Sequence, residues 1–228
     1  MELLMANVFQ NYTPKTFDDL LFEDDAVRQQ LLGYATGFKR SNILLWGQPG
    51  SGKSIAASVI ANDARLASNH IWDFPASVIN GHFWNNNCDS QHQILMGFNT
   101  GNPFVIIDEV DELKSDGLAE LTAFMDKTKH LGSLILTTNT KPKLLLERLV
   151  DRCDVQQIER LSLQKTIQLV RTVFSENGLA HYTPTDIEAL ARTTLSSGFD
   201  TNGSSIKRAS FRHIEKMVDE EITNILTR

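Results

Sequence analysis

The segment Gly47-Gln48-Pro49-Gly50-Ser51-Gly52-Lys53-Ser54 carries the clearest chemical pattern in the chain. It fits G-x-x-x-x-G-K-[ST], in which glycines adopt backbone angles that other residues resist, so that successive N–H groups turn inward around an anion. In this pattern Lys53 reaches the outer phosphates and the hydroxyl of Ser54 binds Mg²⁺. The segment therefore predicts a site for a nucleoside triphosphate with its magnesium ion.

The flanking residues provide the two elements that such a loop needs. The apolar run Ile43–Trp46 predicts a strand before the loop, and Ile55–Ala64 predicts a helix after it. A helix placed there directs the positive end of its dipole at the bound phosphates, so the backbone at Ile55 belongs to the expected binding site.

A second apolar run, Phe104–Ile107, ends in the two carboxylates Asp108 and Glu109. Because polar residues do not alternate with the apolar ones, the run predicts a strand buried on both faces, as in a parallel sheet. Ligands of α/β sheets lie beyond the carboxyl ends of the strands, which places both acids beside the phosphate loop. Asp108 then suits Mg²⁺ binding and Glu109 suits polarising an attacking water, although a pair of acids in a surface turn would look the same.

A third strand is predicted over Ser133–Asn139, again with a polar residue at its end. Asn139 is placed to hold the attacking water or the outermost phosphate. The alternative is that Asn139 only caps the helix predicted over Lys143–Val150.

Composition places the chain among ordinary globular proteins. Of its 228 residues, 41% are hydrophobic and 22% are charged, and the net charge is −6. This charge argues against a surface that binds nucleic acid by bulk electrostatics, but it does not exclude a local basic lining. No apolar run is long enough for a membrane span, and Cys88 and Cys153 are isolated, so we expect a cytoplasmic protein with reduced thiols and no membrane partner.

The order of elements predicts two domains. Strands and helices alternate over residues 1–160, which indicates an α/β parallel-sheet domain preceded by an N-terminal arm. Residues 161–228 read as helices alone, with Thr183 capping one helix and a polar loop at 196–205 leading to a last helix from Ile206. In the arm, Tyr12, Pro14 or Phe17 either covers a nucleotide base or only pins the arm to the core.

With these parts in order, the chain resembles the AAA+ ATPases, and within them the clamp-loader small-subunit group of the replication factors. Gly47–Ser54 matches Walker A, Phe104–Glu109 matches Walker B, and Asn139 falls at the sensor 1 position. The opening Tyr12-Thr-Pro is similar to that group's first motif, with Thr13 in place of Arg. The resemblance implies a P-loop ATPase domain with a helical lid, and Mg²⁺-dependent ATP hydrolysis with catalytic roles for Lys53, Glu109 and Asn139.

Two further site residues rest on the same resemblance. Leu149-Val-Asp-Arg-Cys153 looks like the family's Ser-Arg-Cys element, with Asp151 in place of Ser. This implies that Arg152 is an arginine finger acting on ATP held by a neighbouring subunit. Arg148 is the competing candidate, and an ordinary salt bridge is the alternative role for Arg152.

The family's sensor 2 motif, Gly-Asp-x-Arg at the start of the last lid helix, has a less clear counterpart. Alignment on Ala209 puts Lys207 at the arginine position with Arg208 beside it. Either side chain could report the state of the γ-phosphate to the lid, and both could also be helix-surface charges.

The resemblance implies a homo-oligomer, or a subunit of a hetero-oligomer, whose ATP site is shared between subunits. The family's C-terminal collar domain has no counterpart in this sequence, so we expect assembly through the ATPase and lid modules. The first hypothesis is that ATP turnover is coupled to DNA binding or to loading or remodelling of a DNA-associated complex. The alternative is an ATPase of a mobile-element, phage or defence system that remodels or recruits a protein partner, which the acidic balance of charges and the aromatic, Asn-rich loop around Phe83 and Trp84 favour. The stretch Asp111–Asp116 is more acidic than a helix that tracks DNA phosphates should be.

Overall fold

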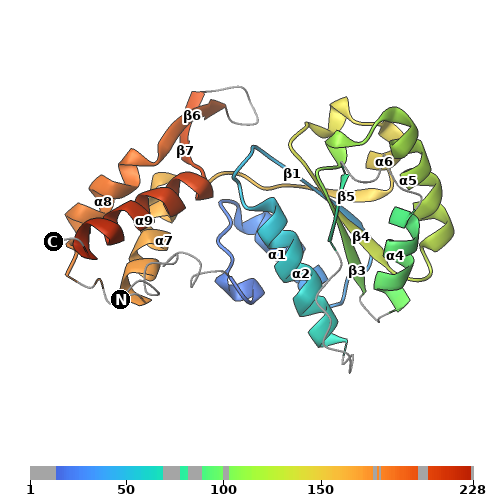
Figure 1. Ribbon diagram of the computed structural model, residues 1–228, viewed down its shortest axis with the longest axis horizontal. Helices are drawn as coiled ribbons and strands as arrows, with labels where there is room; N and C mark the ends of the chain where they lie inside the picture. The colour runs from blue at the N-terminus through green and yellow to red at the C-terminus, as the bar shows by residue number, and fades with distance from the viewer. Residues whose placement is uncertain are drawn as a thin grey trace. The chain divides into compact units, whose positions relative to one another are not determined.

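The computed structural model describes most of the chain (Figure 1), namely residues 14–68, 78–81, 89–99, 103–176, 179, 181–199 and 205–226. These residues form two compact units. The first consists of Lys15–Gln48 and Gly52–Ile158, and the second contains Pro49–Ser51 and Glu159–Arg228. The tip of the predicted phosphate loop is thus grouped with the C-terminal part of the chain.

The first unit is built on a five-stranded sheet in the order β2-β3-β4-β1-β5. All of its strand pairs are parallel. The strands are β1 (Asn42–Trp46), β2 (Val78–Asn80), β3 (Phe104–Asp108), β4 (Ser133–Thr138) and β5 (Cys153–Gln157). The α/β parallel-sheet fold predicted from the uninterrupted apolar runs is confirmed.

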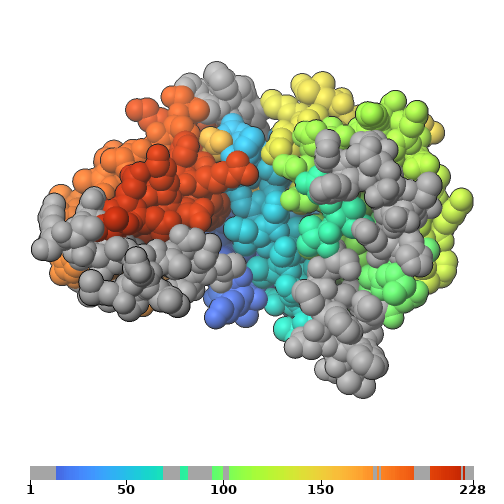
Figure 2. All heavy atoms as spheres, viewed as in Figure 1, coloured from blue at the N-terminus to red at the C-terminus, as the bar shows by residue number. Residues whose placement is uncertain are grey.

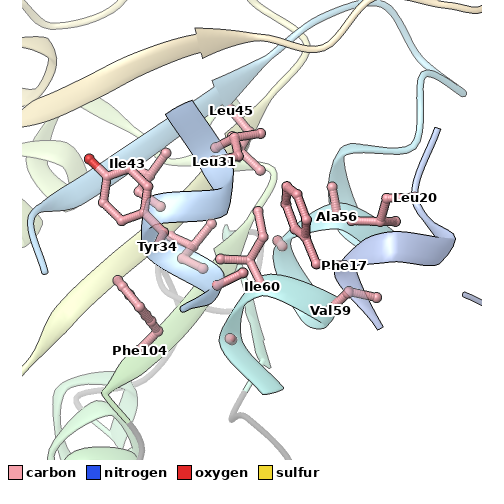
Figure 3. Close-up of a cluster of buried hydrophobic side chains, with 14 of the residues drawn as sticks. Phe17, Leu20, Leu31, Tyr34, Ile43, Leu45, Ala56, Val59, Ile60 and Phe104 are labelled. Carbon is pink, nitrogen blue, oxygen red and sulfur yellow. The ribbon is translucent and has the colours of Figure 1, made fainter. Parts of the chain in front are cut away.

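Both faces of this sheet are covered by helices. Ile43 and Leu45 of β1 pack with α1 (Asp25–Ala35) and α2 (Lys53–Ala67), as Figure 3 shows. Leu44, between them, packs on the opposite face, which α4 (Asp89–Asn99), α5 (Ser115–Thr128) and α6 (Glu147–Val150) cover. Because side chains alternate across a strand, only a run that is apolar at every position can fill both interfaces.

The chain before α1 is tied to the core by Phe17, which lies in η3 (Phe17–Asp19) and is 3% exposed. Its N–H donates to the carboxylate of Asp63 on α2, at 2.8 Å, and its ring lies 5.6 Å from that of Phe22. Phe17 therefore pins this segment to the core. Tyr12 lies outside the described residues.

The single helix predicted over 143–150 is wrong, because this segment forms two short elements. A short 3₁₀ turn, η5 (Pro142–Leu144), is followed by the single-turn α6. Leu145 and Leu146 between them are extended, and both side chains pack against the α4–α5 side of the core. Burial of these two leucines breaks the helix that the local pattern favours.

The second unit contains α7 (Leu163–Glu176), α8 (Pro184–Thr193), α9 (Phe211–Leu226) and the antiparallel pair β6 (Leu195–Phe199) and β7 (Ser205–Ala209). The predicted start of α8 is confirmed, since Thr183 and Asp186 form a reciprocal capping box. The outer face of α9 is exposed and is visible in red in Figure 2. None of the helices in the described parts of the chain is long and apolar enough to cross a membrane.

The helix predicted from Ile206 is wrong, because Ile206–Ala209 belong to strand β7. Backbone pairing decides the outcome: Ile206 is opposite Gly198 in β6, and the N–H of Ala209 donates to the carbonyl of Leu161, at 2.8 Å. The helix begins only after Ser210, whose carbonyl accepts the first helical hydrogen bonds. Residues 206–209 have apolar residues at helical spacing, but their pairing with β6 and Leu161 makes them a strand.

Candidate nucleotide site

The loop between β1 and α2 has the backbone that the glycine pattern predicts. Gly50 and Gly52 have φ values of +75° and +91°, which favour glycine, and Gly52 directly precedes α2. The buried hydroxyl of Ser51 has no hydrogen-bond partner among the described residues. Unpaired donors at a helix N-terminus are what a phosphate group satisfies. Ile55, 40% exposed, lies in the first turn of α2.

Lys53 is 7% exposed and is held at the base of this loop. Its Nζ donates to the carbonyl oxygens of Gly47, at 3.0 Å, and Gln48, at 3.1 Å, and to Oδ1 of Asn139, at 2.9 Å. These acceptors are neutral, so a phosphate oxygen would be a stronger partner for the ammonium group. The structure brings together two of the predicted residues, Lys53 and Asn139.

Ser54 and Asp108 lie where a magnesium ion would bind. The hydroxyl of Ser54 donates to both carboxylate oxygens of Asp108, at 3.0 and 3.2 Å. Within the described ranges no group of three or more His, Cys, Asp or Glu could hold a metal on its own. This donor set fits Mg²⁺, which usually takes one or two protein ligands together with phosphate oxygens and water.

Thr137 connects the two acids and was not predicted. Its hydroxyl donates to Oδ1 of Asp108 and accepts a hydrogen bond from the N–H of Glu109, at 3.0 Å. The side chain is 1% exposed. The signal in the sequence was the pair Thr137-Thr138 after the apolar run Leu134–Leu136, because hydroxyls at the buried end of a strand need partners.

Glu109 leaves strand β3 in the left-handed region, with φ 58° and ψ 54°. It is the only non-glycine residue with positive φ in the described part of the chain. Such a conformation costs of order 1–3 kcal/mol and is found where the side chain must point in a particular direction. Here it directs the carboxylate to Asn80, whose Nδ2 donates to Oε2 of Glu109, at 3.0 Å.

Asn80 is a second residue that sequence reasoning missed. It ends β2 directly opposite Asp108. The next residue is glycine because a Cβ at Gly81 would lie 2.3 Å from the carbonyl oxygen of Glu109. The signal was an Asn-Gly pair at the end of a short strand, beside the strand that carries the acids.

Asn139 is fixed through its backbone as well as its side chain. Its N–H donates to the carboxylate of Asp111, at 3.3 Å, which also accepts from the hydroxyl of Thr140 at 3.3 Å. Asp111 follows the Walker B strand in η4 (Val110–Glu112). The turn after β3 therefore positions the end of β4.

Arg152 is not brought to this site. It precedes β5, whose first residue pairs with Asn42 at the start of β1, whereas the phosphate loop follows the end of β1. At about 3.3 Å per residue, the five residues of β1 separate the two edges of the sheet by about 16 Å. The guanidinium of Arg152 instead binds Asp126 of α5 through two hydrogen bonds, at 2.9 and 2.7 Å.

In the second unit, the tip of the loop contacts Arg160 and the start of α9. Arg160 donates twice to the carbonyl of Pro49, at 3.0 and 2.6 Å, and burial lowers the pKa of its guanidinium. The N–H of Phe211 donates to the carbonyl of Gly50, at 2.9 Å. Cγ of Arg212 lies 3.9 Å from where a Cβ at Gly50 would be. The aliphatic stem of Arg212, in the first turn of α9, thus lies close to Gly50, and the residue is exposed.

Lys207 and Arg208, the predicted sensor 2 candidates, lie on strand β7 and not at the start of a helix. Lys207 is exposed, and Arg208 forms an ion pair with Glu159, at 3.1 Å. The spacing Ala209-Ser210-Phe211-Arg212 fits Gly-Asp-x-Arg at the observed helix start, with Ala and Ser in the first two places. In the sequence, Ser210 was the residue that indicated a helix start at Phe211, because serine is a favoured helix cap. The prediction of a helix through Ile206 and Ala209 obscured this.

Residues 43–161 match the model of the ATPase family associated with various cellular activities (AAA). The chain belongs to this family. Its ATPase domain uses ATP with Mg²⁺, and the loop, Lys53, Ser54 and Asp108 are the residues that would hold them.

Two curated relatives are replication factor C small subunits. The chain is 22% identical to small subunit 1 of Pyrobaculum arsenaticum over 75% of its own length and 52% of the relative's. It is 29% identical to the Archaeoglobus fulgidus protein over 64% of its own length and 46% of the relative's. The chain thus spans about half the length of the curated relatives it matches.

Solved structures of the same fold include replication proteins. AMPPCP-bound DnaA from Aquifex aeolicus matches with a TM-score of 0.67 and 15% identity over 93% of this chain and 65% of that one. Domain III of Thermotoga maritima DnaA matches with a TM-score of 0.67 and 16% identity, over 92% of this chain and 90% of that one. A point variant of Thermotoga maritima RuvB matches with a TM-score of 0.67 and 16% identity, over 95% of this chain and 66% of that one.

Proposed function

We propose that this chain is an oligomeric ATPase that couples ATP hydrolysis to DNA binding or to loading or remodelling of a DNA-associated complex. The hydrolytic step would be in-line attack of water on the γ-phosphate. Lys53 would bind charge that develops on the phosphate, Ser54 and Asp108 would hold a Mg²⁺ ion that neutralises part of it, and Glu109 and Asn139 would place the water.

The position of Arg152 carries the oligomeric part of the proposal. Arg152 lies at the edge of the sheet opposite its own phosphate loop, so it cannot reach ATP bound in the same subunit. Its side chain is 31% exposed and remains accessible to a second chain. An arginine supplied in trans is worth about 10³ to 10⁵ in rate in comparable phosphoryl transfers. We assign Arg152 to the ATP of a neighbouring subunit, in a homo-oligomer or with a related chain.

Arg212 takes the role that the sequence assigned to Lys207 or Arg208. Residues 210–212 contact the loop tip at Gly50. Arg208 is already paired with Glu159. An arginine in this role would sense the γ-phosphate by a bidentate contact, which a lysine cannot make.

DNA is the favoured substrate because relatives by sequence are named as replication factor C subunits and one structural neighbour is DnaA bound to AMPPCP and single-stranded DNA. The deciding experiment is the ATPase rate at low salt with and without DNA, single-stranded and duplex in parallel. We expect stimulation by DNA that falls as salt rises, because phosphate contacts release counterions. A rate that no DNA changes would favour the protein-partner alternative.

A further inference from the structure

The guanidinium of Arg152 is held in one orientation by three hydrogen bonds. Nε and Nη2 donate to the two carboxylate oxygens of Asp126, at 2.9 and 2.7 Å. Nη1 donates to the carbonyl oxygen of Arg148, one helical turn earlier, at 2.6 Å. The bidentate contact keeps the pKa of Asp126 below its ordinary value, so this carboxylate is ionised throughout the neutral range. The guanidinium fork of Arg152 therefore has a defined direction in this structure.

This arrangement leaves part of the fork unused. An arginine carries five N–H donors, and three are engaged here, so two remain, one on Nη1 and one on Nη2. Neither has a hydrogen-bond partner among the described residues, and the side chain is 31% exposed. Two N–H groups held in one plane match a pair of phosphate oxygens.

We propose that Asp126 is a positioning residue for catalysis in trans, which holds Arg152 with two donors directed at the γ-phosphate of a neighbouring subunit. The inference rests on the proposed function of Arg152. Orienting the fork before the subunits meet reduces the rotamer entropy that the arginine loses on reaching the transition state. Asp126 touches no substrate and acts only through Arg152.

The opposite role would be a latch, in which Asp126 neutralises Arg152 and must release it. The two roles predict opposite signs for the variant Asp126→Ala. Positioning predicts that kcat falls about tenfold with little change in the KM for ATP, because misplacement of a catalytic group costs about one to two orders of magnitude. A latch predicts a higher kcat. Asp126→Asn, which keeps one acceptor oxygen, should lie between Asp126→Ala and the unchanged protein.

Glu120→Ala is the matched control, because Glu120 is an exposed acid of the same helix with no assigned contact to Arg152. It should leave kcat unchanged. The reactivity of Cys153, which follows Arg152 in the sequence, reports whether the local fold is intact. Burial raises the pKa of its thiol to about 12. With Cys88→Ser as background, alkylation of Cys153 at pH 8 should stay slow in Asp126→Ala, and rapid labelling would mean that the variant has disrupted the local fold.

The deciding test is a double-mutant cycle. If Asp126 acts through Arg152, the pair Arg152→Ala with Asp126→Ala has the same rate as Arg152→Ala alone, and a further loss in the double variant would overturn the inference. Mixing Asp126→Ala with Lys53→Ala subunits should restore turnover, because the Lys53→Ala subunit supplies an intact Asp126–Arg152 pair. If Arg152→Ala itself does not slow turnover, the proposed function fails, and this inference fails with it. If Arg152→Ala slows turnover but Asp126→Ala does not, only this inference fails.

Discussion

The two edges of the parallel sheet differ in how far their functional side chains are satisfied within the chain. At the carboxyl edge, Lys53, Ser54 and Asp108 have partners on one another or on adjacent residues. At the amino edge, Arg152 is held by Asp126 but keeps two unused donors. The first set fits a ligand bound by this subunit, and in the proposed function the second set serves a group that a neighbouring subunit supplies.

The side chains at the two edges are also oriented by different means. Glu109 is oriented by its backbone, in a left-handed conformation supported by Asn80 and Gly81. Arg152 is oriented by side-chain hydrogen bonds on a surface that is partly exposed. A substitution at the carboxyl edge should therefore affect only the ATP of its own subunit, whereas one at the amino edge should affect the ATP of a neighbour.

Glu109→Gln should have the largest effect. The amide keeps the size of the side chain but cannot act as a base, so turnover should fall by about 10⁴ while ATP binding is retained. Turnover and equilibrium binding of a fluorescent ATP analogue, measured on the same preparation, check this. Unchanged turnover would show that Glu109 does not activate the attacking water, and hydrolysis could then not be assigned to the residues of the carboxyl edge.

Arg152→Ala should lower kcat by about 10³ without weakening ATP binding to the same subunit, because the missing charge acts elsewhere. Arg148→Ala is the control, since only its backbone carbonyl contacts Arg152. If Arg148→Ala causes the large loss and Arg152→Ala does not, the finger is Arg148 and the amino-edge assignment must be exchanged.

Arg212→Ala should reduce turnover by about tenfold, with Lys207→Ala and Arg208→Ala as comparison variants. The expectation follows from the position of Arg212 beside Gly50, since a charge-assisted hydrogen bond to phosphate contributes about 1.5–3 kcal/mol. Steady-state kinetics of the three variants decides between them. A larger loss in Arg208→Ala than in Arg212→Ala would restore the original sensor 2 assignment.

Thr137→Val should have the smallest effect, a few-fold loss of kcat with a higher Mg²⁺ concentration needed for half-maximal rate. Valine keeps the shape but removes the hydroxyl that joins Asp108 to the N–H of Glu109. The N–H of Glu109 loses the acceptor that Thr137 provides, whereas Oδ1 of Asp108 still accepts from Ser54, and one hydrogen bond of this kind contributes about 0.5–1.5 kcal/mol. A magnesium titration of turnover measures it, and a curve identical to that of the unchanged protein would show that this hydroxyl does not orient the metal ligand.

The carboxyl edge was predictable because its residues lie at strand ends or in the glycine loop that follows a strand. Lys53, Asp108 and Asn139 each stand close to the end of an apolar run, and parallel strands bring such positions together. Thr137 and Asn80 were missed because their roles depend on the order of strands in the sheet, which a single sequence does not give. The β6–β7 pair and the start of α9 at Phe211 were missed for a related reason, because strand pairing overrode a local helical pattern at Ile206.

In the proposed function, two subunits share one ATP site. The most direct test of this sharing is the turnover of a mixture of Arg152→Ala and Lys53→Ala subunits at a fixed total concentration. We expect a rate well above the sum of the two variants measured separately, because the first subunit contributes an intact phosphate loop and the second an intact Arg152. A rate no higher than that sum, with both variants still assembling with unchanged protein, would contradict it.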